Sequence, residues 1–248
     1  MNKYTLKDII DSRDERKKYI DKIDLWVFFV VRPLANLLTW PFLRFKISAN
    51  SATLISTIVG FIGAGFLILG TTRNTLLVGL IVMNLWIVFD CIDGNIARTT
   101  KKSNPLGTYF DGLSGYCYVS LLYTALGVAV YKNYDLMIGN INYNWVYILI
   151  GAIASMMCIL PRLFEHKALS SFKNYRSEIT DKDHYSLFYI VGLNIAGMAG
   201  LSNPLMIVSF LGNILNVYLV FYFCVQTFIG LFSIRKTLKN VILSQRKD

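Results

Sequence analysis

Residues 74–97 read NTLLVGLIVMNLWIVFDCIDGNIA, an apolar run whose last third carries two aspartates, Asp90 and Asp93. The run is long enough for a helix to cross a hydrocarbon core of about 30 Å, which takes roughly 20 residues. The two acids are three residues apart and therefore share one face of that helix. An ionisable group inside a membrane segment is costly and marks a candidate functional site. The stretch predicts a membrane helix with a polar site at one end.

The rest of the chain has the same apolar character. Of its 248 residues, 54% are hydrophobic and 16% charged, and the mean hydropathy is +0.48. The chain is too apolar and carries too few charges for an ordinary soluble domain, which indicates a polytopic membrane protein. We therefore predict an all-α integral membrane protein with six transmembrane helices, at about 50–69, 74–97, 106–131, 143–164, 185–201 and 204–233.

The segment before these spans is expected to lie at the membrane surface. The apolar stretch from Asp24 to Lys46 contains Arg32 and two prolines, which suit an interfacial amphipathic helix better than a span. The predicted organisation is thus a cytoplasmic segment and interfacial helix (1–46), a six-helix membrane catalytic domain (47–234) and a cytoplasmic tail (235–248).

Basic residues predict the orientation of the spans. Only two of the 25 Lys and Arg residues, Arg73 and Lys132, fall in the alternate short loops near 70–73, 132–142 and 202–203. The side with the other 23 is cytoplasmic by the positive-inside rule, so both termini and the aspartates are expected there. The same topology explains the net charge of +10, and no basic motif indicates nucleic-acid binding.

A third acid, Asp111, lies near the start of the next predicted span, four residues after Gly107. Three carboxylates brought together suit Mg²⁺ or Mn²⁺, which prefer oxygen ligands and often bridge to substrate phosphates. The alternative is a structural ion pair between these acids and Arg98.

The acids belong to a spaced pattern, Asp90-x2-Asp93-Gly94-x2-Ala97-Arg98-x8-Gly107-x3-Asp111. It resembles the signature of the CDP-alcohol phosphotransferase (CDP-alcohol phosphatidyltransferase) family, and all seven fixed positions up to Asp111 match. The family carries a fourth aspartate four residues later, where this chain has Gly115. That aspartate is thought to deprotonate the acceptor hydroxyl, so the chain resembles an atypical member whose catalytic base is unknown.

The resemblance implies a metal-dependent membrane transferase of substituted phosphate groups. It places the metal at the three aspartates and the nucleotide of an activated donor at Gly94, Ala97, Arg98 and Gly107. It also implies release of a nucleoside monophosphate, a lipid or alcohol acceptor, a role in phospholipid or glycolipid synthesis, and a homodimer. From the residues alone, Gly94 also fits a helix-packing contact, and Arg98 also fits a positive-inside anchor.

Three further residues are candidates for substrate contacts. Asn50 stands in a segment that resembles the family's entry to the first span, although a helix cap is another role for it. Arg162 and His166 lie in or beside the longest polar loop, 165–184, where they would bind an anionic group or be solvated.

Gly115 leaves three interpretations of the function open. The protein uses a hydroxyl acceptor with a base from elsewhere, or an ionised acceptor such as polyprenyl phosphate, or it is a non-catalytic nucleotide-binding relative. A small transporter with the acids as an ion site is a further alternative. The sequence identifies neither the donor group nor its nucleobase.

Overall fold

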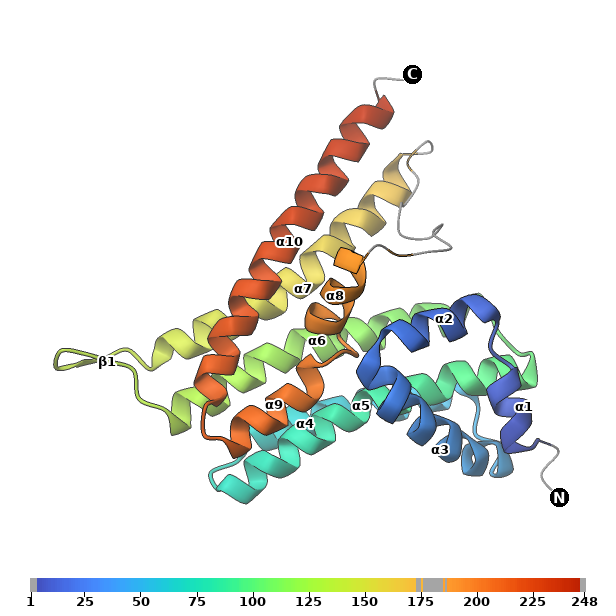
Figure 1. The fold of residues 1–248 in the computed structure, drawn as a ribbon, viewed down its shortest axis with the longest axis horizontal. Helices are drawn as coiled ribbons and strands as arrows, with labels where there is room; N and C mark the ends of the chain where they lie inside the picture. Colours follow the sequence, from blue (N-terminus) through green and yellow to red (C-terminus); the bar gives the residue numbers. More distant parts are fainter. Residues whose placement is uncertain (1–3, 173–174, 176–184, 186, 246–248) are drawn as a thin grey trace.

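The computed structural model describes residues 4–172, 175, 185 and 187–245. These residues are almost entirely helical, with one short hairpin (Figure 1). The elements in chain order are α1 Leu6–Asp11, α2 Glu15–Ile23, the π-helical turn η1 Val27–Val31, α3 Arg32–Arg44, α4 Ala49–Leu69, α5 Arg73–Thr100, α6 Pro105–Asn133, β1 Met137–Ile138, β2 Ile141–Asn142, α7 Trp145–Ser171, α8 Leu187–Ala196, α9 Ser202–Leu211 and α10 Leu215–Gln245.

Polar side chains define where the long helices begin. The hydroxyls of Ser48 and Thr72 and the amide oxygen of Asn104 accept hydrogen bonds from the first free backbone N–H groups of α4, α5 and α6. Pro105 occupies the first turn of α6, where its missing N–H costs nothing. The α5–α6 connection is therefore short, and it brings the end of α5 beside the start of α6.

Small residues on α4 allow the central helices to approach closely. Ala52, Ser56, Gly60 and Ala64 recur every four residues and are all buried. Gly60 leaves room for a ring pair formed by Trp86 of α5 and Tyr118 of α6, whose centroids are 3.9 Å apart. This packing holds α5 and α6, the two helices that carry the aspartates, in one layer with α4.

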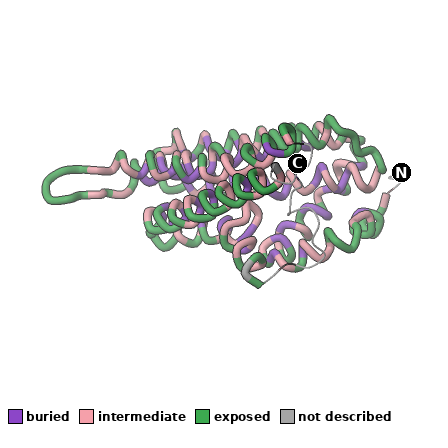
Figure 2. Tube along the Cα trace, turned by 90° about the horizontal axis from the view of Figure 1, so that it is seen from above, coloured by how far each residue is buried: buried purple, intermediate pink, exposed green. Residues whose placement is uncertain are grey.

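The fold class predicted from the sequence is confirmed: the protein is an all-α polytopic membrane protein with a helical segment before the spans. Five helices, α4, α5, α6, α7 and α10, are long and apolar enough to cross a membrane. A sixth candidate is the pair formed by α2 and Val27–Arg44, which is bent by 116°. Large apolar side chains face outward along these helices, and the α6–α7 hairpin projects beyond them with mainly exposed residues (Figure 2).

The boundaries expected for the fifth and sixth spans are wrong. Instead of separate spans at 185–201 and 204–233, the structure has two ten-residue helices, α8 and α9, joined by an unwound segment at 197–201. Gly200 is required in that segment, because a Cβ there would lie 2.5 Å from the carbonyl oxygen of Asn194. The next break falls at Gly212–Ile214, where Asn213 has a φ of +58°, so the predicted loop at 202–203 lies inside the bundle.

Contacts place the last turn of α8 against the N-terminal segment and the end of α9 at the α4–α5 end of the bundle. The Asn194 side chain of α8 bonds to the backbone of Ile23 and Leu25 in the N-terminal segment. At the other end, Arg73 donates to the carbonyls of Phe210 and Leu211 at the end of α9. Helix α9 therefore leads from the level of the N-terminal segment to the α4–α5 end of the bundle, and α10 returns in the opposite direction (Figure 1).

The N-terminal segment is held together internally by a buried acid. Asp21 of α2 accepts from Arg13 and from Arg32 of α3, each at 2.8 Å, and its side chain is only 8% exposed. Arg32, the arginine that interrupts the predicted interfacial helix, is therefore neutralised inside the protein. The network locks the angle between α2 and α3.

Asp21→Asn is expected to destabilise the protein by about 3 kcal/mol, because it leaves two mostly buried guanidinium groups without their carboxylate. The free energy of unfolding in mixed detergent micelles measures the effect. Asp11→Asn, at an exposed acid on α1, is the matched control and should change it little. Equal stabilities of the two variants would show that the network does not hold the segment.

Candidate functional site

The three signature aspartates meet at one end of the helix layer. Asp90 and Asp93 lie in the last three turns of α5, and Asp111 lies in the second turn of α6. One carboxylate oxygen from each falls within 4.8 Å of the others. The antiparallel pair α5–α6 with its short connection thus converts the sequence spacing into a single cluster.

The carboxylates fit a divalent cation. Asp90 Oδ1 is buried without a hydrogen-bond partner among the described residues, and an unpaired buried carboxylate oxygen is a strong acceptor for a metal. Asp93 is oriented by a short hydrogen bond from the Thr53 hydroxyl of α4, which fixes its rotamer as outer partners of metal ligands do. Three carboxylates with no nitrogen or sulfur donor match the ligands that Mg²⁺ and Mn²⁺ prefer.

A cavity of about 190 Å³ opens beside this cluster. Asp93 and Asp111 line it, together with every residue for which the sequence predicts nucleotide contacts: Gly94, Ala97, Arg98 and Gly107. Asn50 lines it too. Six of the seven residues of the spaced pattern, all except Asp90, therefore line one pocket, which joins the ends of α4, α5 and α6.

Arg98 is held against the wall of this cavity by a chain of buried amides. Its guanidinium folds back over Gly94, so that a Cβ on Gly94 would lie 3.0 Å from Arg98 Nη1. Arg98 Nη2 donates to Asn95 Oδ1 at 3.0 Å. The Asn95 amide nitrogen in turn donates to Asn36 and Thr39 of α3. A structural role thus accompanies the expected one, because α3 sets the position of the arginine.

Another part of the cavity wall is formed by Gly107, which lies close to Asn50, and by polar side chains. A Cβ on Gly107 would lie 3.1 Å from the Asn50 side-chain oxygen, so a larger residue would press on Asn50. The helix cap of α4 is Ser48 rather than Asn50, which leaves the Asn50 amide free of that role. Lys17 of α2 and Lys102 also line the cavity.

Gly115 lies one turn beyond Asp111 and is buried. A Cβ added there would meet only Met198 Cε, at 3.9 Å, which is an ordinary contact. Neither neighbour in sequence replaces a carboxylate: the Ser114 hydroxyl bonds to Ser56 and Thr57 of α4, and the Tyr116 hydroxyl bonds to His166. At the position of the family's fourth aspartate, Gly115 therefore leaves room for a Cβ and supplies no functional group.

Arg162 and His166 belong to α7, which extends to Ser171, so they are helical residues rather than loop residues. Neither lines the cavity. The positive charge of Arg162 acts on Asp90. His166 Nδ1 lies 2.9 Å from the Tyr116 hydroxyl. Most of the predicted loop 165–184 lies outside the described residues.

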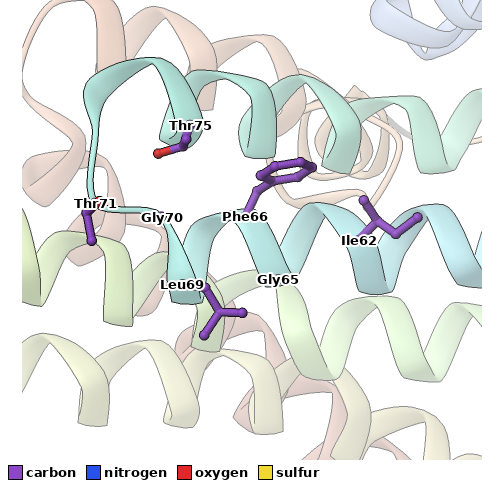
Figure 3. Close-up of a pocket in the computed structure, with 7 residues that line it drawn as sticks. All are labelled: Ile62, Gly65, Phe66, Leu69, Gly70, Thr71 and Thr75. Carbon is purple, nitrogen blue, oxygen red and sulfur yellow. The ribbon is translucent and has the colours of Figure 1, made fainter.

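A second cavity, of about 430 Å³, lies at the far end of the bundle, around the turn between α4 and α5 (Figure 3). Leu69, Gly70 and Thr75 line it with other uncharged residues. It contains no group that could hold a phosphate or a metal ion, so the aspartate cluster is the chemically equipped site.

Several polar residues of this site were not predicted from the sequence, among them Thr53, Asn95, Lys17 and Lys102. Each of these residues touches the cavity or one of its charged groups. Asn95 had a detectable signal, because it is a polar residue inside the spaced pattern and next to Gly94. Lys17 had none, since nothing in the sequence places α2 over the ends of α4–α6.

Three clustered carboxylates beside a polar cavity in a polytopic helical membrane protein fit a membrane enzyme that acts on phosphate-containing substrates. The chain belongs to the CDP-alcohol phosphatidyltransferase family, whose sequence model matches residues 46–222. The family consists of transferases of phosphorus-containing groups, with a CDP-alcohol as donor. No curated protein is significantly similar to the chain.

Proposed function

We propose that the protein transfers a phospho-alcohol or phospho-sugar group from a CDP-alcohol-type donor to a lipid acceptor, with release of the nucleoside monophosphate. The observation that carries this proposal is the meeting of Asp90, Asp93 and Asp111 at the edge of a cavity lined by the other signature residues. Family membership supplies the reaction class, and the cavity supplies the residues.

The chain's own residues would bind and orient the donor. The flat cavity floor at Gly94 and Ala97 and the tight wall at Gly107 leave space for a nucleotide. Arg98, fixed by Asn95, points its guanidinium along this floor, where a diphosphate can accept its hydrogen bonds. A divalent ion held by the three aspartates would neutralise charge on the diphosphate and on the departing monophosphate.

The acceptor is proposed to carry an ionised phosphate, as polyprenyl phosphate does. Its oxygen needs no base, and among the described residues no acid stands at or beside Gly115 to serve as one. Gly115 puts no negative charge in the way of an anionic acceptor, and Arg162, which does not line the nucleotide cavity, supplies a positive charge near Asp90. The product would be a diphosphate-linked lipid.

The test is a transfer assay with purified protein, Mg²⁺, a panel of CDP-alcohols and nucleotide sugars, and lipid acceptors including polyprenyl phosphate. Mass spectrometry of the released nucleotide and the lipid product should show a monophosphate only when donor, metal and acceptor are all present. Nucleotide binding without any turnover would favour a non-catalytic relative. Accumulation of an ion in proteoliposomes without monophosphate release would favour a transporter.

The active site is proposed to face the cytoplasm, with both termini on that side. The distribution of Lys and Arg supports this orientation, since only Arg73 and Lys132 lie at the opposite end. A homodimer is proposed on the family resemblance, and light scattering of the detergent complex tests it.

The orientation predicts a labelling pattern. In a cysteine-free background, a membrane-impermeant maleimide added to intact cells should label Asn140→Cys in the α6–α7 hairpin and miss Lys101→Cys in the α5–α6 connection. Lys101→Cys should become reactive after the membrane is opened, which controls for its accessibility. Labelling of Lys101→Cys alone in intact cells would invert the topology and separate the site from cytoplasmic nucleotide.

A further inference from the structure

The donor cavity has a wall that comes from outside the family-matched region. The match covers residues 46–222, whereas Lys17 belongs to α2, Glu15–Ile23. Lys17 nevertheless lines the same cavity as Asp93, Asp111, Gly94 and Arg98. Helix α2 thus contributes to the cavity from outside the matched region.

The position of Lys17 in its helix is electrostatically unfavourable. It occupies the first turn of α2, and its backbone N–H is one of the groups that Asp14 caps. The N-terminal end of a helix carries partial positive charge and disfavours a cation. Of the three cations in this first turn, Arg16, Lys17 and Lys18, only Lys17 lines the cavity.

Lys17 lies near a second cation, Arg98, and near the carboxylate of Asp111. Its charge interacts unfavourably with Arg98 and favourably with Asp111. Lys102 lines the same cavity, so three cations surround a volume of about 190 Å³. With a divalent ion on the aspartates, the cavity as a whole is positive, and a diphosphate would relieve the repulsion between Lys17 and Arg98.

The position of Lys17 is fixed by ion pairs made by its own helix. Asp21 lies one turn further along the same face of α2 and is held between Arg13 and Arg32. Helix α3, which Arg32 begins, also positions Arg98 through Asn36, Thr39 and Asn95. Lys17 and Arg98, which both line the cavity, are therefore positioned by the same N-terminal segment.

Building on the proposed function, we propose that Lys17 binds the diphosphate of the activated donor directly, and that the N-terminal segment is the part of the donor site that closes it from the surface. A charge-assisted hydrogen bond from an ammonium to a phosphate oxygen would form across the cavity from Arg98. The family signature on α5 and α6 is then incomplete as a donor site without α2.

The experiment measures the Kd of CDP for the full-length protein in neutral detergent with Mg²⁺, so that anionic lipid headgroups are absent. Lys17→Met should weaken CDP binding about tenfold, as expected for one charge-assisted contact at a solvent-accessible site. Lys17→Arg, which keeps the charge, should stay within about threefold of wild type. Lys22→Met, at an exposed lysine of the same helix, is the matched control and should bind CDP as wild type does.

Equal CDP affinity of wild type and Lys17→Met would overturn the inference while leaving the proposed function intact. A joint loss of CDP affinity and of the thermal unfolding midpoint in both Lys17→Met and Lys17→Arg would also overturn it, because that pattern indicates a structural role. Absence of CDP binding to the wild-type protein would instead overturn the proposed function, and the inference with it.

Discussion

Replacing any one of Asp90, Asp93 or Asp111 by asparagine is expected to reduce phospho-group transfer by about a thousandfold or more. Each carboxylate would contribute one oxygen to a cluster whose ligand atoms lie within 4.8 Å of one another. Loss of metal-assisted charge stabilisation costs several kcal/mol in the transition state, and each 1.36 kcal/mol is a factor of about ten in rate. Release of the nucleoside monophosphate measures the effect.

The asparagine variants keep the size of the side chain, so they are expected to fold, as size-exclusion profiles in detergent would show. Asp135→Asn, at an exposed acid beside the far hairpin, is the control for loss of a carboxylate as such. Wild-type turnover in EDTA, or an Asp111→Asn variant as active as the parent, would remove the metal-site assignment.

Gly115→Asp is expected to lower transfer to the true acceptor by about a hundredfold. If the acceptor is an ionised phosphate, a carboxylate at this position repels it, and a like-charge contact costs several kcal/mol. The new side chain has room at its Cβ, where the nearest atom is Met198 Cε at 3.9 Å. The loss would therefore come from charge and from the volume taken from the acceptor, not from misfolding.

Gly115→Asn separates these two contributions, because it adds nearly the same volume without the charge and should retain more activity than Gly115→Asp. A hydroxyl acceptor predicts the opposite sign for the aspartate. The substitution would then restore a general base and raise the rate by part of the roughly 10²- to 10⁴-fold that such a base supplies. A faster Gly115→Asp enzyme would contradict the phosphate-acceptor proposal.

The spans that carry the site could be predicted because their signals are local. The apolar run from residue 74 to the aspartates is a complete helix with caps at Thr72 and Lys101, and α6 begins where Asn104 and Pro105 indicate. Four residues of spacing between Gly107 and Asp111 were enough to place both on the cavity side of α6.

The broken segment α8–α9 could not be predicted in the same way. Its apolar composition continues across the unwound residues 197–201, so hydropathy alone suggests an ordinary span. The break is stabilised by tertiary contacts: Asn203 and Ser202 donate to the free carbonyls of Met198 and Gly197. Such contacts satisfy the backbone groups that an interrupted membrane helix exposes, and they are visible only in three dimensions.

The polar side chains that position Arg98 could not be predicted for a related reason. Asn36 and Thr39 lie on α3, which the sequence indicates only as an interfacial helix, and their partner Asn95 is 59 residues away from Asn36 along the chain. Residue spacing within one helix predicts a shared face, but it gives no information about which face another helix will cover. For the same reason, Lys17 could not be predicted as a residue that lines the cavity.

The central claim is that Asp90, Asp93 and Asp111 together hold a divalent ion at the donor's diphosphate. A crystal structure of the wild-type protein with Mn²⁺ and CDP, with data collected at the manganese absorption edge, tests it most directly. The account predicts an anomalous peak among the three carboxylates, with the CDP diphosphate beside it in the cavity of Gly94 and Arg98. An anomalous peak elsewhere, or CDP bound away from an empty aspartate cluster, would contradict the account.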